Sequence, residues 1–163
     1  MKSPDLAKMQ QQFSSFISSM KSLTLGTINE EGKPFLSYAP FALHQGKLYI
    51  YISRIAQHYR HLEANPSADV MLIEDESRSA NLFARQRARF ACTAINVGNE
   101  GCEPIFALLE QSFGEPMIGM LRELDFSLFE LIPLEGRYVV GFGQTFDIDV
   151  TGERFELAAI DRS

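Results

Sequence analysis

The chain has 163 residues, 45% hydrophobic and 22% charged, a composition typical of a globular protein with one real core. Its formal net charge of −6 excludes the broad basic surface that sequence-independent nucleic-acid binding needs. With no apolar run near the roughly 20 residues of a membrane span, no signal peptide, and two cysteines without zinc-ligand spacing, we expect a cytoplasmic protein without membrane or nucleic-acid partners.

The first part of the chain predicts a helix followed by an antiparallel meander. Ser3 and Pro4 suit a helix start, and apolar residues recur at helical spacing from there to Met20. Short turns then separate stretches with strand character, as in consecutive hairpins. The expected strands cover residues 23–28, 35–43 and 47–53.

The stretch 47–75 predicts a strand, a short helix and a second strand, with a candidate anion site where the first strand meets the helix. Apolar and polar residues alternate over 47–53, as in a half-buried strand. A short helix over 54–63 follows, ends before Asn65–Pro66, and precedes a buried strand at 70–75. A hydroxyl, cations and a helix N-terminus would favour an anion where strand and helix meet. The side chains expected near that spot are Ser53, Arg54, His58 and Arg60.

The second part predicts further strands with two helices among them. The expected elements are a strand over 84–96, helices over 103–114 and 116–124, a hairpin of 126–132 with 137–142, and a weaker hairpin of 146–150 with 155–159. This pattern predicts an α+β fold, an antiparallel barrel with helices at its edges. We expect one domain over 1–163, divided into an N-terminal helix (1–21), a barrel core (22–150) and a tail (151–163).

Three arginines at alternate positions, Arg85, Arg87 and Arg89, would share one face of a strand. Their guanidiniums repel one another unless they are solvated or neutralised. Two interpretations stay open. The face is either solvated and paired with the acidic run 74–76, or it holds a phosphate or carboxylate ligand. Charge-assisted hydrogen bonds to such a ligand would contribute about 1.5 to 3 kcal/mol each.

No set of residues predicts a metal site. His58 and His61 lie three residues apart on the short helix, but no carboxylate or cysteine occupies a matching position, and His44 lies in a turn. We therefore expect a surface helix that carries two histidines. The chain also lacks the G-x-S-x-G pattern of a nucleophile elbow, and we predict no catalytic residue.

Several motifs in the same order resemble a known superfamily over about residues 22–150. The stretch 47–75, above all HLEANPSADVML, resembles the cofactor-binding segment of the pyridoxamine 5′-phosphate oxidase-like split-barrel superfamily. Four other stretches resemble its haem-utilisation (HugZ/HutZ-type) branch: SYAPF (37–41), MLIEDE (71–76), LFARQR (82–87) and GFGQ (141–144).

The resemblance implies a six-stranded split barrel that works as a homodimer, with a flat cofactor in each of two clefts between the subunits. In flavin-binding members the FMN phosphate is held at the end of the third strand, on the following helix and on a later barrel strand. Carried over, these positions are Ser53, His58, Gln86 and Arg87, with Ser37 and Tyr38 lining the cleft. The neighbouring Arg54 and Arg85 complete the predicted cofactor-binding set.

The resemblance leaves three functions open. The first is an FMN-dependent oxidoreductase, and the second is a protein that binds or degrades haem, with arginines on the propionates. The third is a dimeric binding protein without catalysis. Haem-degrading members bind iron through a histidine near the C-terminus, whereas residues 152–163 contain none. That branch also has an acidic residue near the haem, which corresponds to Asp125.

Overall fold

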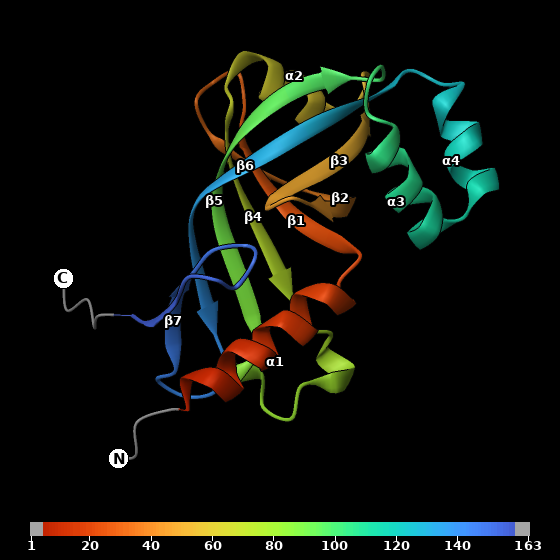
Figure 1. Ribbon diagram of the computed structural model, residues 1–163. Helices are drawn as coiled ribbons and strands as arrows, with labels where there is room; N and C mark the ends of the chain where they lie inside the picture. Colours follow the sequence, from red (N-terminus) through yellow and green to blue (C-terminus); the bar gives the residue numbers. More distant parts are fainter. Residues whose placement is uncertain (1–4, 159–163) are drawn as a thin grey trace.

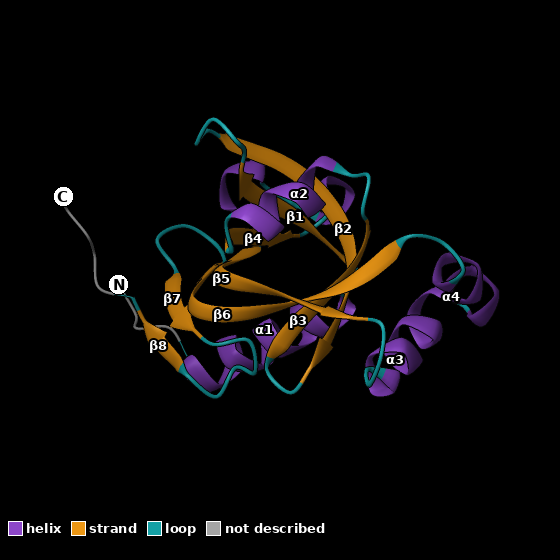
Figure 2. Ribbon diagram, turned by 90° about the horizontal axis from the view of Figure 1, so that it is seen from above, coloured by secondary structure: helices purple, strands orange, loops and turns teal. Residues whose placement is uncertain are grey.

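Six antiparallel strands close into a barrel in the computed structural model, which describes residues 5–158 (Figures 1 and 2). The strand order is β3-β2-β1-β4-β5-β6, and β6 pairs back with β3 to complete the ring. The strands are β1 (Ser22–Ile28), β2 (Pro34–His44), β3 (Lys47–Ser53), β4 (Ser67–Ile73), β5 (Arg87–Gly98) and β6 (Phe126–Val139). The predicted α+β fold with a six-stranded barrel is confirmed.

Strand β6 extends beyond the barrel. Along one side it pairs with β5, and along the other it pairs first with β3 and then with β7 (Thr145–Ile148), which in turn pairs with β8 (Phe155–Leu157). The terminal hairpin is thus confirmed. The hairpin predicted over 126–142 is wrong, because a bulge at Leu134 lets β6 bend and continue along β5.

Both faces of β3 are buried, which the alternating pattern did not predict. Its aliphatic residues face the barrel interior. Tyr49 and Tyr51 face a second apolar cluster, made with α3 (Glu103–Phe113) and α4 (Glu115–Arg122). The Tyr51 ring meets Phe106 edge-on, with ring centroids 5.3 Å apart. The α3–α4 pair therefore covers the outside of the barrel at β3 (Figure 2).

Helices α1 (Leu6–Ser19) and α2 (Gln57–Ala64) lie at opposite ends of the barrel (Figure 1). Asp5 caps α1 by accepting a hydrogen bond from the Lys8 N–H, while the predicted start at residues 3–4 lies outside the described residues. Helix α2 begins later than predicted because residues 53–56 form a turn, closed by the Ala56 N–H on the Ser53 carbonyl. Among the described residues, no helix combines the length and apolarity that crossing a bilayer demands.

Candidate functional site

Ser37 on β2 and His58 on α2 form a direct pair. Their Oγ and Nδ1 atoms lie 2.8 Å apart, which fixes the orientation of the imidazole ring. Burial, and secondarily the charge of His61, lowers the pKa of His58 from its usual 6.5. The ring is therefore neutral at neutral pH, and its Nε2 atom has no hydrogen-bond partner within residues 5–158.

We expect the depressed pKa of His58 to make folding stability pH-dependent. Between the folded pKa and the unfolded value of 6.5, the unfolded chain binds more protons, so stability rises with pH across that window. Acidification from neutral pH should therefore cost wild type more stability than His58→Gln. Urea unfolding across this range measures the difference, and parallel slopes for the two proteins would contradict it. Proton NMR should show the ring titrating below 6.5.

Ser53, at the end of β3, is bonded to a carboxylate instead of facing an open anion site. The Ser53 hydroxyl donates to Asp125 Oδ1 over 2.9 Å and accepts from the Ile55 N–H at 3.3 Å. Arg54 lines a shallow surface cavity beside them, together with Ser127. Arg60 is drawn away by Glu30, 3.6 Å distant. The four side chains that were predicted to converge on one anion therefore make separate contacts.

His61 is buried, so the predicted surface helix with two histidines is wrong. The residue is only 2% exposed; its Nδ1 lies 2.9 Å from Thr27 Oγ1, and Phe35 packs edge-on against the ring. Glu30 lies 3.7 Å from its other nitrogen. Helix α2 thus uses one histidine to pack on β1 and the other to face Ser37. In the part of the chain that the structure describes, no cluster of metal-ligating side chains occurs.

Arg85 and Gln86 precede β5 instead of lying on it, because residues 82–84 form a short 3₁₀ turn. Arg85 therefore does not share a strand face with Arg87. It donates to the Glu74 carbonyl at 2.5 Å and lies 3.7 Å from Glu76, as the salt-bridged interpretation anticipated for this residue. Gln86 accepts a hydrogen bond from the Tyr138 hydroxyl.

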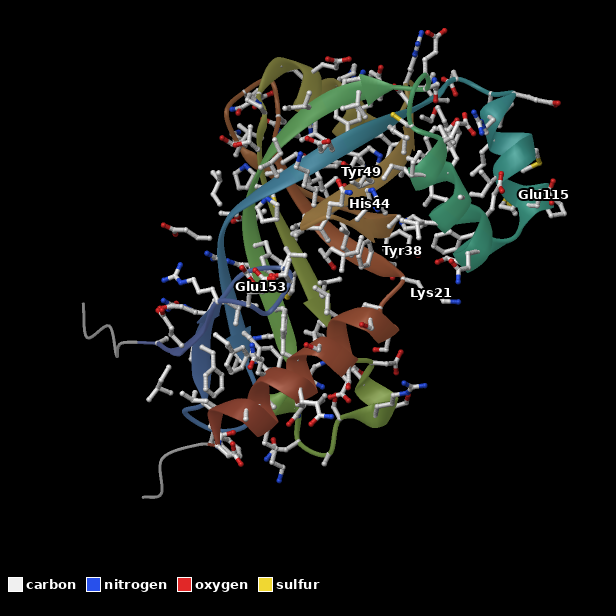
Figure 3. All side chains as sticks on the ribbon, viewed as in Figure 1. Lys21, Tyr38, His44, Tyr49, Glu115 and Glu153 are labelled. Carbon is white, nitrogen blue, oxygen red and sulfur yellow. The ribbon has the colours of Figure 1, made fainter. Side chains whose placement is uncertain are left out.

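Tyr38 lies on the outward face of β2, 63% exposed, and its neighbour on that face, Leu36, is 75% exposed (Figure 3). Gly26 lies across from Leu36 on β1 and adds no side chain to cover it. An exposed aromatic and an exposed aliphatic side chain therefore lie together on the outer surface of β2. The predicted lining role of Tyr38 would require a ligand or a second chain against this face.

Arg87 donates to the Arg85 carbonyl, but its side chain lines a cavity that includes none of the groups above. It lines a surface cavity of about 490 Å³ with Arg89, Arg137 and Arg154. The turn that carries Arg154, marked by Glu153 in Figure 3, brings the last of these beside β5 and β6. Sequence reasoning missed Arg137 and Arg154, because only the register of β5 on β6 places Arg137 opposite Arg89.

The chain resembles known proteins over most of its length. A family profile described as pyridoxamine 5′-phosphate oxidase matches residues 9–139. Heme oxygenase HutZ of Vibrio cholerae is 38% identical over 144 residues, which cover 86% of this chain and 81% of HutZ. A crystal structure of HutZ, described as a heme storage protein, superposes with a TM-score of 0.74 over 80% of this chain and 93% of HutZ.

A second solved structure is that of ChuZ from Campylobacter jejuni, 33% identical with a TM-score of 0.85. The match covers 96% of this chain but 65% of ChuZ, so the chain spans about two thirds of that relative. The family profile and the two solved structures match this chain over the whole barrel. The chain therefore belongs to the pyridoxamine 5′-phosphate oxidase family, within its haem-utilisation branch.

Proposed function

We propose that this protein binds haem, in a cleft that two copies of the chain share. Two observations support haem over FMN. One is the description of the relative HutZ, named a heme oxygenase and, in its crystal structure, a heme storage protein, and the other is the electrostatics at the end of β3. The proposal covers haem binding, whether for breakdown or for storage. Bound haem would supply the redox chemistry, while the chain holds and orients it.

The carboxylate of Asp125 is the observation that carries the proposal. In flavin-binding relatives, the end of the third strand holds the FMN phosphate. Here the Ser53 hydroxyl at that position already donates to Asp125 Oδ1. A phosphate dianion placed there would face a carboxylate, and like charges at hydrogen-bond distance are strongly unfavourable. Haem avoids this repulsion if its cationic iron lies toward this end of the cleft and its propionates lie toward the arginines at the other end.

His58 offers an imidazole, one of the side chains that bind haem iron in proteins. The ring is neutral, its Nδ1 is oriented by Ser37, and its Nε2 is left available within the described residues. Metal-bound histidines are held in this way, with one ring nitrogen on the metal and the other in a hydrogen bond that sets the tautomer. We therefore assign His58 as the candidate iron ligand.

Two copies are needed because the predicted cofactor residues lie too far apart in one chain. Ser53 pairs with Phe126 at the start of β6, whereas Arg87 pairs with Val139 at its end. Thirteen strand residues span roughly 40 Å, longer than one porphyrin. We name Ser53, Arg54 and His58 the first half-site, and Arg85, Gln86 and Arg87 the second. A symmetric dimer would place the first half-site of one copy against the second half-site of the other.

We expect wild-type protein titrated with haem to develop a sharp Soret band, and His58→Ala to bind at least about tenfold more weakly with an altered band. His44→Ala serves as the matched control, because His44 lies at the end of β2 and has no part in the His58–Ser37 pair. An unchanged Soret band and affinity in His58→Ala would remove His58 as ligand. A broad, unsaturated band in wild type would count against haem binding altogether.

FMN remains the second candidate because the family match and the second half-site both suit a phosphate. The same titration with FMN decides between them: a yellow complex that Arg87→Gln weakens would favour the flavin. Asp125→Asn should increase FMN affinity if the carboxylate excludes the phosphate, and should not do so if Asp125 is unrelated to it.

Sharing between copies can be tested by mixing His58→Ala with Arg87→Gln. Neither variant alone has a complete cleft. Random subunit exchange makes half of the dimers mixed, and each mixed dimer has one intact cleft, so about one quarter of the clefts should recover wild-type haem affinity. Mass measurement shows whether the subunits have exchanged. If they have exchanged and no clefts recover wild-type haem affinity, both half-sites lie within one chain.

A further inference from the structure

The arginine-lined cavity on the outer face of β5, β6 and β7 is a second feature that could bind a ligand. It measures about 490 Å³ and is a surface groove rather than an enclosed hole, since most of the arginines that line it are exposed. The protein as a whole carries a net charge of −6, so this local concentration of cations runs against its overall charge. The lining residues are Met71, Arg87, Arg89, Glu135, Gly136, Arg137, Val139, Asp147 and Arg154.

Arg89 and Arg137 face each other directly across the β5–β6 ladder. Residues opposite one another in an antiparallel pair have Cβ atoms about 4.5–5.5 Å apart, and like charges there destabilise the sheet. Arg87 lies two residues from Arg89 and so projects from the same face. The sheet thus holds three guanidiniums close together on one surface, an arrangement that costs folding energy unless something neutralises it.

Protein groups neutralise this cluster only in part. Arg137 donates to Asp147 at 3.1 Å, and Arg154 lies 3.5 Å from Glu156. Arg87 donates through Nη1 to the Arg85 carbonyl at 2.9 Å, which satisfies one donor but supplies no charge. Arg89 has no carboxylate within ion-pair distance among residues 5–158. Arg87 and Arg89 therefore carry the positive charge that no ion pair among the described residues neutralises, and Arg89 faces Arg137.

We propose that this cavity binds an oxyanion, a carboxylate or a phosphate, between Arg89 and Arg137, with Arg87 and Arg154 at its rim. Guanidinium groups bind both anions through paired, charge-assisted hydrogen bonds. Met71 and Val139 give the cavity an apolar wall that suits the carbon frame of an organic acid. The cavity forms within one chain and shares Arg87 with the second half-site, so it can bind a free anion in the absence of haem or hold a propionate of bound haem.

Inorganic phosphate is the first probe, measured by calorimetry at low ionic strength. Phosphate affinity should fall about tenfold in Arg89→Gln, which loses the charged donors. Without phosphate, the same variant should be as stable as wild type or more stable, because the substitution removes one member of a repelling pair. Arg78→Gln is the matched control, an exposed arginine outside this cavity. Wild-type phosphate affinity in Arg89→Gln would overturn the proposal.

Haem and its dimethyl ester then identify the source of the anion. If the cavity takes a propionate, Arg89→Gln should weaken haem binding about tenfold and leave the ester unaffected. If it takes free phosphate, haem affinity should be equal in both proteins and only phosphate binding should fall. If neither protein binds haem, the proposed haem function is wrong. The phosphate measurement still tests whether the arginine-lined cavity binds an anion.

Discussion

Gly136→Ala is expected to destabilise the protein by about 3 kcal/mol, because the new methyl group has no room. A Cβ atom at this position would lie 2.6 Å from a ring carbon of Phe90 and 2.7 Å from the Ile148 carbonyl oxygen. Phe90 is fully buried, and the Ile148 carbonyl belongs to the β6–β7 ladder. Relief would therefore need either a repacked core or a broken strand pairing. Urea unfolding measures the loss.

The matched control for this substitution is Gly119→Ala on α4. No atom lies within 4 Å of a Cβ at Gly119, and alanine is a better helix former than glycine, so we expect a gain of up to about 1 kcal/mol. A second check combines Gly136→Ala with Phe90→Ala. Removing the ring should recover part of the loss, so the two effects should not add. A loss below about 1 kcal/mol in Gly136→Ala would show that the strands adjust.

The strands of the barrel could be predicted because their signals are local. Alternation over residues 47–53 and short turns at Gly32 and Gly46 need only neighbouring residues, and they gave β1, β2 and β3 in nearly their observed bounds. The strand β6 shows where local signals fail. Residues 134–136 resemble a turn, yet the strand bends at a bulge there and continues, because pairing with β5 and, from Gly136 on, with β7 stabilises the extended form.

The candidate site was harder to predict, since its contacts join residues distant in sequence. His58 was predicted from the junction of strand and helix and again from the resemblance, and Ser37 from the resemblance alone, but their contact depends on how α2 packs on the end of the barrel. The bond between Ser53 and Asp125 spans 72 residues, and no periodicity reveals it. The same holds for Arg89 and Arg137, whose opposition is a matter of register. Residue types suggested the chemistry, whereas pairing decided which groups meet.

Phe13→Ala is expected to cost about 4 kcal/mol and to release α1 from the barrel. Phe13 is completely buried and meets Tyr138 edge-on, with ring centroids 5.1 Å apart. Its ring also lies near Phe155 of β8 and the Gly152 turn. The single side chain thus ties the helix to β6 and to the terminal hairpin. Truncation leaves a cavity at the centre of this contact, which rigid strands cannot fill.

Hydrogen exchange can distinguish local release of α1 from a uniform loss of stability. If Phe13 is the main anchor, amides of α1 in Phe13→Ala should exchange well before those of β1 and β4, which lie in the barrel proper. Phe13→Leu should lose less, because it keeps most of the apolar volume. Leu6→Ala, on the same helix at a 45% exposed position, should cost under about 1 kcal/mol. Equal losses for Leu6→Ala and Phe13→Ala would mean that the anchor lies elsewhere in α1. A large loss with no early exchange in α1 would show that the helix and the barrel unfold as one unit.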